Sequence, residues 1–232
     1  MLPEHLRAVC FDIGGVLVRV PRGFLAEELA DTLGADPDRV RQLLIEYGKR
    51  RRSSSRILAR ALATGCGQPV DVDRVEAILR QRHRDIADPV LYPDAIPTME
   101  TLRAAGWRIC FLSNAISDTA DRPRPAWFSF AEVVVHSWEI GYCKPEIQAF
   151  RAIEQRMGLA AREIVSVGDS LRSDVLGALD ASWSAVHLPR TGRPPPPPHV
   201  VPTISSLPEL LTILPPVRGG SVHAGAINDA AR

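Results

Sequence analysis

Lysine is nearly absent from this chain: of its 28 basic residues only Lys49 and Lys144 are lysines, and the remaining 26 are arginines. The basic residues are balanced by 27 acidic ones, which leaves a formal net charge of +1. Proteins that attract nucleic acid usually carry an excess of positive charge, clustered on one face. We therefore expect no nucleic-acid partner.

Long apolar runs and paired cysteines are also missing. No run approaches the ~20 apolar residues that a membrane-spanning helix needs, and the first residues, MLPEHLRAVCFD, hold too many charges for a secretory signal. The four cysteines show neither CxxC pairs nor zinc-site spacing, which favours reduced thiols. We expect a cytoplasmic protein with no membrane partner, and its oligomeric state stays open.

Short apolar runs alternate with helical periodicity, which is typical of an α/β fold with a parallel sheet and crossover helices. Five runs are nearly all apolar, as expected for strands that are covered on both faces: 8–11, 109–112, 133–136, 164–167 and 185–188. The stretch at 21–89, between the first and the second of these runs, has no such run. It predicts three or four amphipathic helices, at 24–33, 37–47, 53–63 and 73–86, with Asp36 and Asp71 in positions that suit N-caps.

These patterns predict an organisation of the whole chain. We expect an α/β core formed by residues 1–20 and 90–214, with a helical insertion at 21–89. The five prolines at 194–198 predict an extended connector of unassigned role. The small and polar residues at 215–232 predict a disordered tail.

Acidic residues follow two of the predicted strands. Asp12 follows the run AVCF, Asp169 follows IVSVG, and Asp174 stands five residues further on. Open α/β sheets bind their ligands at the carboxyl ends of the strands, and converging carboxylates suit a hard cation such as Mg²⁺. Each aspartate alone could instead cap a helix, but the three together favour a metal site.

Two further segments end near the same edge. Ser113 and Asn114 close the run ICFLSN and offer a hydroxyl, an amide and backbone N–H groups to an anionic oxygen. Lys144 precedes a predicted helix whose N-terminus also favours anions. Taken singly, a Ser-Asn pair is common in turns and a lone lysine is usually solvated.

In chain order, FDIGGVLV, FLSN, KP and GDSLRSD resemble the motifs of the haloacid dehalogenase-like (HAD) hydrolase superfamily. The resemblance covers nearly the whole chain, from Ala8 to about Leu214. It implies a Rossmann-like core of five parallel strands in the order 5-4-1-2-3, with an α-helical cap inserted between the first two motifs. The implied activity is Mg²⁺-dependent hydrolysis of a phosphate monoester on a small molecule.

The resemblance also implies roles for individual residues. Asp12 would be the nucleophile and would form an aspartyl-phosphate. Magnesium would be held by Asp12, by the backbone carbonyl of Gly14 and by Asp169. Asp174 would assist catalysis, as a ligand through water or by orienting its neighbours.

The substrate's phosphoryl oxygens would be held by three groups on the other strand ends. These are the Ser113 hydroxyl, the Asn114 backbone N–H and the Lys144 ammonium. Lys144 would also offset the repulsion between an anionic nucleophile and an anionic substrate.

The chain departs from the family pattern at Gly14. Phosphatases of the family usually carry a second aspartate there, which protonates the leaving group and then activates water, and such help is worth ~10²–10⁴-fold. Three interpretations follow: a phosphatase whose proton transfer uses another group or water, a haloacid dehalogenase, and a non-catalytic binding protein. The paired acids of GDSLRSD weaken the second, because displacement of a halide needs no metal.

The basic segment KRRRSSSR lies within the predicted helical insertion. A solvated helix face is its simplest interpretation, because the net charge is near zero and no aromatic residues interleave the segment. A substrate-contacting arginine is the alternative hypothesis, with four candidates: Arg50, Arg51, Arg52 and Arg56.

Overall fold

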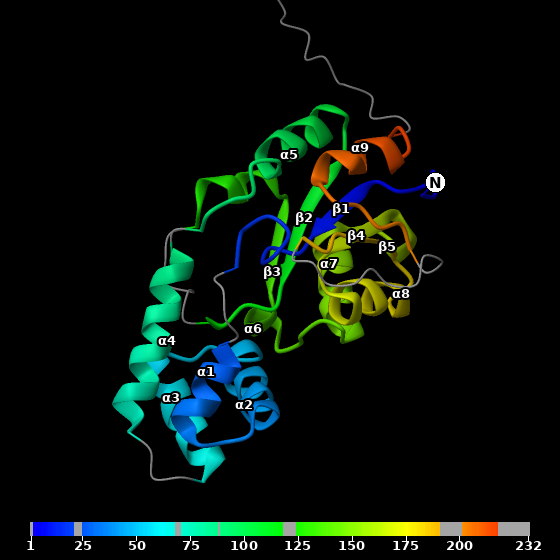
Figure 1. Cartoon of the computed structure of the whole chain (residues 1–232). Coiled ribbons are helices and arrows are strands. Elements are labelled where there is room, and N and C mark those ends of the chain that lie inside the picture. Colours follow the sequence, from blue (N-terminus) through cyan, green and yellow to red (C-terminus); the bar gives the residue numbers. More distant parts are fainter. Residues whose placement is uncertain are drawn as a thin grey trace, which may run out of the picture.

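Figure 1 shows a computed structural model of the chain, which describes residues 2–20, 25–67, 71–87, 89–117, 124–190 and 201–217. The proline run and most of the expected tail lie outside these residues. Within the described part, no helix combines the length and the apolar character needed to cross a bilayer.

Five parallel strands form one sheet in the order β3-β2-β1-β4-β5. This is the predicted order, and each strand lies within one residue of its predicted range at either end. The α/β, Rossmann-like fold is therefore confirmed. The strands are β1 (Ala8–Phe11), β2 (Arg108–Ser113), β3 (Val133–His136), β4 (Ile164–Gly168) and β5 (Ser184–His187).

Helices cover both faces of this sheet (Figure 1). In β1, Val9 and Phe11 point into one buried cluster, whereas Ala8 and Cys10 point into the other. This two-sided burial explains why the strands are almost wholly apolar. The first face is covered by α5 (Ala95–Ala104) and α9 (Leu210–Ile213), and the second by α7 (Ile147–Met157) and α8 (Gly177–Asp180).

Between β1 and α5 the chain forms a helical unit with a hydrophobic cluster of its own. It lies beyond the carboxyl ends of the strands, next to the short helix α6 (Ser137–Ile140) that directly follows β3 (Figure 1). Asp36 accepts backbone hydrogen bonds at the start of α2, as its position predicts. The helices are α1 (Leu25–Leu33), α2 (Pro37–Leu44), α3 (Ser55–Cys66) and α4 (Val72–Ala87).

The helix expected at 37–47 changes its geometry part of the way along. The α-helical part ends at Leu44, and the chain continues as the π-helical turn η1 (Ile45–Lys49). Turns of this kind are rare and often occur at functional sites. This one faces the core, since η1 contacts α6.

Two segments of chain connect the helical unit to the core and pair with each other. Arg19 donates its backbone N–H to the Val90 carbonyl at 2.8 Å, and Tyr92 donates to the Leu17 carbonyl at 2.9 Å. These backbone hydrogen bonds hold the segment that enters the helical unit beside the segment that leaves it. The entering segment begins a few residues after Asp12 in the chain.

Candidate active site

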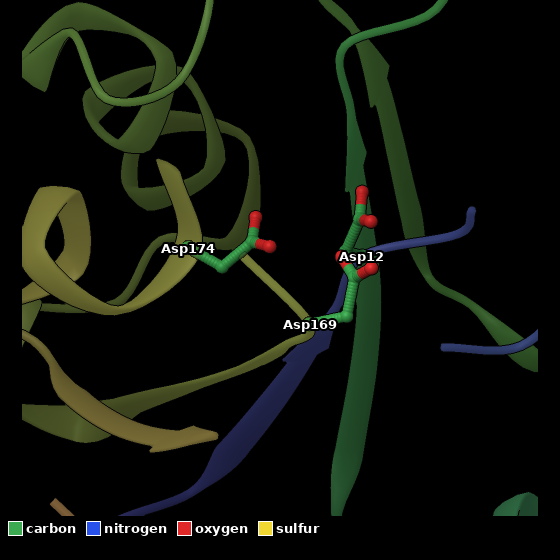
Figure 2. Close-up of side chains that lie close together, drawn as sticks. All are labelled: Asp12, Asp169 and Asp174. Atoms are coloured by element: carbon green, nitrogen blue, oxygen red, sulfur yellow. The ribbon is translucent and has the colours of Figure 1, made fainter. Parts of the chain in front are cut away.

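The strand-end aspartates meet at the carboxyl edge of the sheet, as the sequence predicts. Asp12 directly follows β1 and Asp169 directly follows β4, and these two strands are neighbours in the sheet. Asp174 approaches from the turn after β4, and Figure 2 shows the three carboxyl groups gathered in one place. One oxygen from each of the three lies within 4.8 Å of the other two.

Two glycines allow this close approach. Gly15 has a φ of +81°, and a Cβ on it would lie 2.5 Å from an oxygen of Asp169. A Cβ on Gly168 would lie 2.1 Å from the Cβ of Asp174. Both distances are shorter than a van der Waals contact. A residue with a side chain at either position would therefore displace the neighbouring aspartate, and glycine lets that aspartate lie directly against the backbone.

Lys144 lies between two of the acids. Its Nζ is 2.8 Å from Asp12 Oδ1 and 2.5 Å from Asp174 Oδ1. Burial alone would lower the pKa of Lys144, but the charges of Asp12 and Asp174 outweigh burial and raise that pKa. Lys144 therefore stays an ammonium, although its side chain is almost completely buried.

For the Asp12 carboxyl, burial has the larger effect on the pKa and the charge of Lys144 has the smaller one. Burial raises its pKa, and although Lys144 opposes this effect, the charges of Asp174 and Asp169 add to it. Three carboxylates face one ammonium here, which leaves an excess of negative charge in a buried place. A cation with a preference for oxygen ligands fits this set of groups.

The side-chain amide of Asn114 binds the protein backbone, whereas the sequence suggests that it could bind an anionic oxygen. Its side-chain Nδ2 donates to the Lys144 carbonyl at 2.8 Å, and the Lys144 backbone N–H donates to Asn114 Oδ1 at 2.9 Å. The amide thus fixes the backbone that carries the lysine. Ser113 ends β2 beside it, and only 9% of its surface is exposed.

Sequence reasoning missed His187, which ends β5. Its ring Nε2 lies 3.1 Å from the backbone carbonyl oxygen of Asp169. Because a carbonyl oxygen only accepts hydrogen bonds, this contact requires the proton to be on Nε2. His187 is buried and holds the loop that presents the Asp169 carboxyl group.

Gly14 leaves open the position where the family usually has its second aspartate. A Cβ built there would meet no atom closer than 4.0 Å, a methyl carbon of Val20. A β-carbon at this position would therefore fit without moving the backbone. The missing acid follows from the residue type and not from lack of space.

Three of the four candidate arginines of KRRRSSSR pair with neighbouring acids, which lends no support to the hypothesis that one of them contacts substrate. Arg50 pairs with Glu146 at 2.8 Å, Arg51 pairs with Glu46 at 3.6 Å, and Arg56 pairs with Glu76 at 2.8 Å. Arg52 also has an interaction partner. The first residue of the segment, Lys49, is the one whose charge interacts with Asp12 and Lys144.

Comparisons with known proteins agree with this geometry. A model of the haloacid dehalogenase-like hydrolase family matches residues 6–182. The chain is 33% identical over 97 residues to a glyceraldehyde 3-phosphate phosphatase of Methanothermobacter thermautotrophicus, which covers 41% of this chain and 43% of that protein. It is 32% identical over 143 residues to a phosphoserine phosphatase of Thermus thermophilus, which covers 60% and 55%.

The chain spans about half the length of the curated relatives it matches. Solved structures with the same fold include a HAD phosphatase from Thermococcus onnurineus, with a TM-score of 0.56, 24% identity and coverage of 92% of this chain and 100% of that one. A 2-haloacid dehalogenase from Pseudomonas syringae has a TM-score of 0.60, 19% identity and coverage of 90% and 99%. Because the family model matches most of the sequence, the chain belongs to the haloacid dehalogenase-like hydrolase family.

Proposed function

We propose that the chain is a Mg²⁺-dependent phosphatase that hydrolyses a phosphate monoester of a small molecule. One observation carries this proposal above all: the Asp12 carboxylate, whose side chain is 13% exposed, lies 2.8 Å from the buried Lys144 ammonium, inside a cluster of acids at the strand ends. The names of its relatives, glyceraldehyde 3-phosphate phosphatase and phosphoserine phosphatase, support the same reaction class.

The three carboxylates fit a divalent cation by number and by ligand type, because they exceed the one ammonium among them by two charges. We assign the metal to Asp12, to Asp169 and to the backbone carbonyl of Gly14. When bound, Mg²⁺ supplies positive charge that stabilises the transferring phosphoryl group. Asp174 holds Lys144 in place with one oxygen and accepts the Ser170 backbone N–H with the other, at 3.0 Å.

In the proposed reaction an Asp12 oxygen attacks phosphorus, and the ester P–O bond breaks. The electron pair of that bond leaves with the alcohol oxygen, which takes a proton from water. Water then attacks the aspartyl-phosphate, which releases inorganic phosphate and restores the carboxylate. Lys144, the Ser113 hydroxyl and the Asn114 backbone N–H hold the phosphoryl oxygens through both steps.

Gly14 gives the leaving alcohol no side-chain acid. We therefore expect faster turnover of esters whose leaving group is already acidic, such as p-nitrophenyl phosphate, than of alkyl phosphates. Gly14→Asp should narrow this difference in turnover, because it adds an acid at a position where the new β-carbon meets no atom closer than 4.0 Å. The control is Gly14→Asn, which fills the same space without adding an acid.

Gly14 also suits two other functions. A haloacid dehalogenase needs no acid at this position, since halide leaves without a proton, and a binding protein needs no turnover. Against the first, the acid cluster has no task in a displacement that uses no metal. The second is tested with beryllium fluoride and Mg²⁺: a higher melting temperature without turnover of any ester supports a binding role.

We propose further that helices α1–α4, within residues 21–89, act as a cap that closes over the strand ends and selects the substrate. The backbone pairing of residues 17–19 with 90–92 forms the connection to the core. This connection is the natural place for the two parts to move relative to each other.

The first experiment measures inorganic phosphate released from a panel of small phosphate esters, with Mg²⁺ or with EDTA. Asp12→Asn should abolish the release, and EDTA should abolish it in the wild type. Asp180→Asn is the matched control, because it makes the same chemical change at an exposed residue of α8. Release that persists in Asp12→Asn would contradict the proposed nucleophile.

A further inference from the structure

The π-helical turn η1 holds Lys49 between two contacts with the core. On one side, a Cβ on Gly48 would lie 3.5 Å from the side chain of Ile116, which packs into the helical unit. On the other side, Arg50 forms its 2.8 Å ion pair with Glu146. Ile116 belongs to the loop after β2 and Glu146 to the loop before α7, and these two loops carry polar groups of the candidate site.

A second pair of hydrogen bonds reinforces this contact. The Ser53 backbone N–H donates to Ser117 Oγ at 2.6 Å, and that hydroxyl donates to the Ser53 carbonyl at 3.1 Å. Both serines are buried. The segment that carries Lys49 is therefore fixed to the core on both sides of the lysine, and is not a loose surface loop.

Lys49 is close enough to the site for its charge to interact with three groups there. Burial lowers its pKa, while Cys143 and Asp12 raise it and Lys144 lowers it further. Among the residues that the structure describes, no acidic group forms an ion pair with Lys49. A partly desolvated ammonium without a counter-ion is unfavourable, so the position suits an anion that arrives with the substrate.

The composition of the chain adds an independent observation. Every basic residue other than Lys49 and Lys144 is an arginine, and the charges of both lysines interact with Asp12. An ammonium is compact and carries its donors on one nitrogen, whereas a guanidinium is a broad planar group. The chain thus has an ammonium at the two lysine positions whose charge interacts with Asp12.

We propose that Lys49 binds a carboxylate on the leaving half of the substrate, so that the substrate is a phosphate monoester of a hydroxy acid. This inference rests on the proposed phosphatase function. The nucleophile and the leaving group lie on opposite sides of phosphorus, so the leaving group points from Asp12 toward the helical unit. Lys144, the Ser113 hydroxyl and the Asn114 backbone N–H are already assigned to the phosphoryl oxygens, and the single further ammonium of Lys49 matches a single carboxylate.

A pair of ligands that are not hydrolysed tests this directly. Isothermal titration in Mg²⁺ compares 3-phosphonopropionate with propylphosphonate, which carries a methyl group in place of the carboxylate. The wild type should bind the first roughly tenfold to a hundredfold more tightly, as expected for a charged hydrogen bond. Lys49→Met should remove this preference and leave the affinity for propylphosphonate nearly unchanged, and Lys49→Arg should restore part of the preference.

Arg51→Met is the matched control, because it removes one positive charge two residues away, from a side chain that pairs with Glu46 and stacks on Tyr47. It should keep the wild-type preference. An unchanged preference in Lys49→Met would overturn the inference, and so would an equal loss for both ligands, which would assign Lys49 to the phosphoryl group. If the wild type binds neither ligand, the proposed phosphatase function itself fails and the inference fails with it.

Discussion

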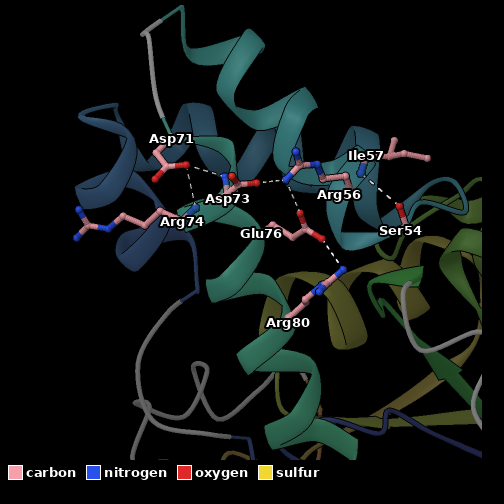
Figure 3. A network of polar contacts seen from close by, with 8 residues as sticks. All are labelled: Ser54, Arg56, Ile57, Asp71, Asp73, Arg74, Glu76 and Arg80. Atoms are coloured by element: carbon pink, nitrogen blue, oxygen red, sulfur yellow. Dashed lines mark hydrogen bonds and ion pairs between the residues drawn. The ribbon is translucent and has the colours of Figure 1, made fainter.

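Charged side chains are arranged in opposite ways in the two parts of the molecule. At the strand ends, the side chains of Lys144 and Asp174 are only 4% and 3% exposed, and they pair with each other. In the helical unit, Arg56 links Asp73 and Glu76 (Figure 3); the side chains of Arg56 and Asp73 are 41% and 78% exposed, whereas that of Glu76 is 10% exposed. The first group is desolvated and crowded, and the second reaches water through Arg56 and Asp73.

This difference in exposure indicates different roles for the charged residues at the strand ends and for those in the helical unit. Surface ion pairs contribute little to stability, about 0–1 kcal/mol each, so the helical network only helps to fix α3 against α4. Burying several charges in one place carries a desolvation penalty that pairing rarely exceeds. A cluster of three acids and one lysine is therefore poorly explained by stability alone, and it is expected where the fold serves chemistry.

The largest expected effect is that of Lys144→Met. Removing the ammonium leaves Asp12 and Asp174 facing each other, and phosphate release should fall by roughly 10²–10³-fold, as for loss of a preorganised charge stabiliser. Lys144→Arg should not restore the rate, because the lysine nitrogen lies within 2.8 Å of both carboxylates and leaves no room for a guanidinium. A rate in Lys144→Met within threefold of the wild type would contradict the role proposed here.

Asn114→Ala should have the next largest effect, on the rate and not on the fold. Its two hydrogen bonds fix the Lys144 backbone, and losing such a positioning contact typically costs about 10–100-fold in activity. We expect kcat to fall while the melting temperature changes little. Asn114→Asp keeps the acceptor for the Lys144 N–H but loses the donor to the Lys144 carbonyl, so its kcat should lie between those of the wild type and Asn114→Ala. Equal rates in both variants would argue against positioning.

Gly15→Ala at the strand ends and Gly34→Ala in the helical unit compare the same substitution in the two parts of the molecule. Both glycines have positive φ, so each substitution should lower the free energy of unfolding by about 1–2 kcal/mol in urea denaturation. Only at Gly15 would the new methyl group also collide with Asp169, since nothing lies within 4 Å of the position at Gly34. Activity should therefore be lost in Gly15→Ala and kept in Gly34→Ala. Similar activities would show that Asp169 tolerates displacement.

The candidate site was only partly predictable from sequence. Asp12 and Asp169 could be located because a parallel strand buried on both faces leaves a continuous apolar run, and the residue after it must lie at the carboxyl edge. Lys144 depends on the order of the motifs, since nothing within a loop shows which way its lysine points. The strand order likewise required the family resemblance, although the α/β class did not.

Lys49 and His187 were missed for different physical reasons. A regular period of 3.6 residues was expected through residue 47, but the π-helical turn over Ile45–Lys49 inserts an extra residue and rotates the chain that follows. The direction of Lys49 therefore could not be derived from periodicity. His187 acts on the backbone of Asp169, a contact between neighbouring strands that becomes visible only when their register is known.

The smallest effect is expected for Arg56→Gln, at the opposite end of the comparison. Arg56 bridges Asp73 and Glu76. Its loss should lower the free energy of unfolding by about 1 kcal/mol, because its pair with Asp73 is exposed and screened by salt and because Glu76 keeps its second partner, Arg80. Arg80→Gln, which loses the 2.7 Å pair of Arg80 with the same Glu76, should behave alike. Phosphate release should stay at the wild-type level in both. A tenfold loss of activity in either variant would mean that the helical network sets the position of Lys49 over the site, and the separation between a structural and a chemical group of charges would no longer hold.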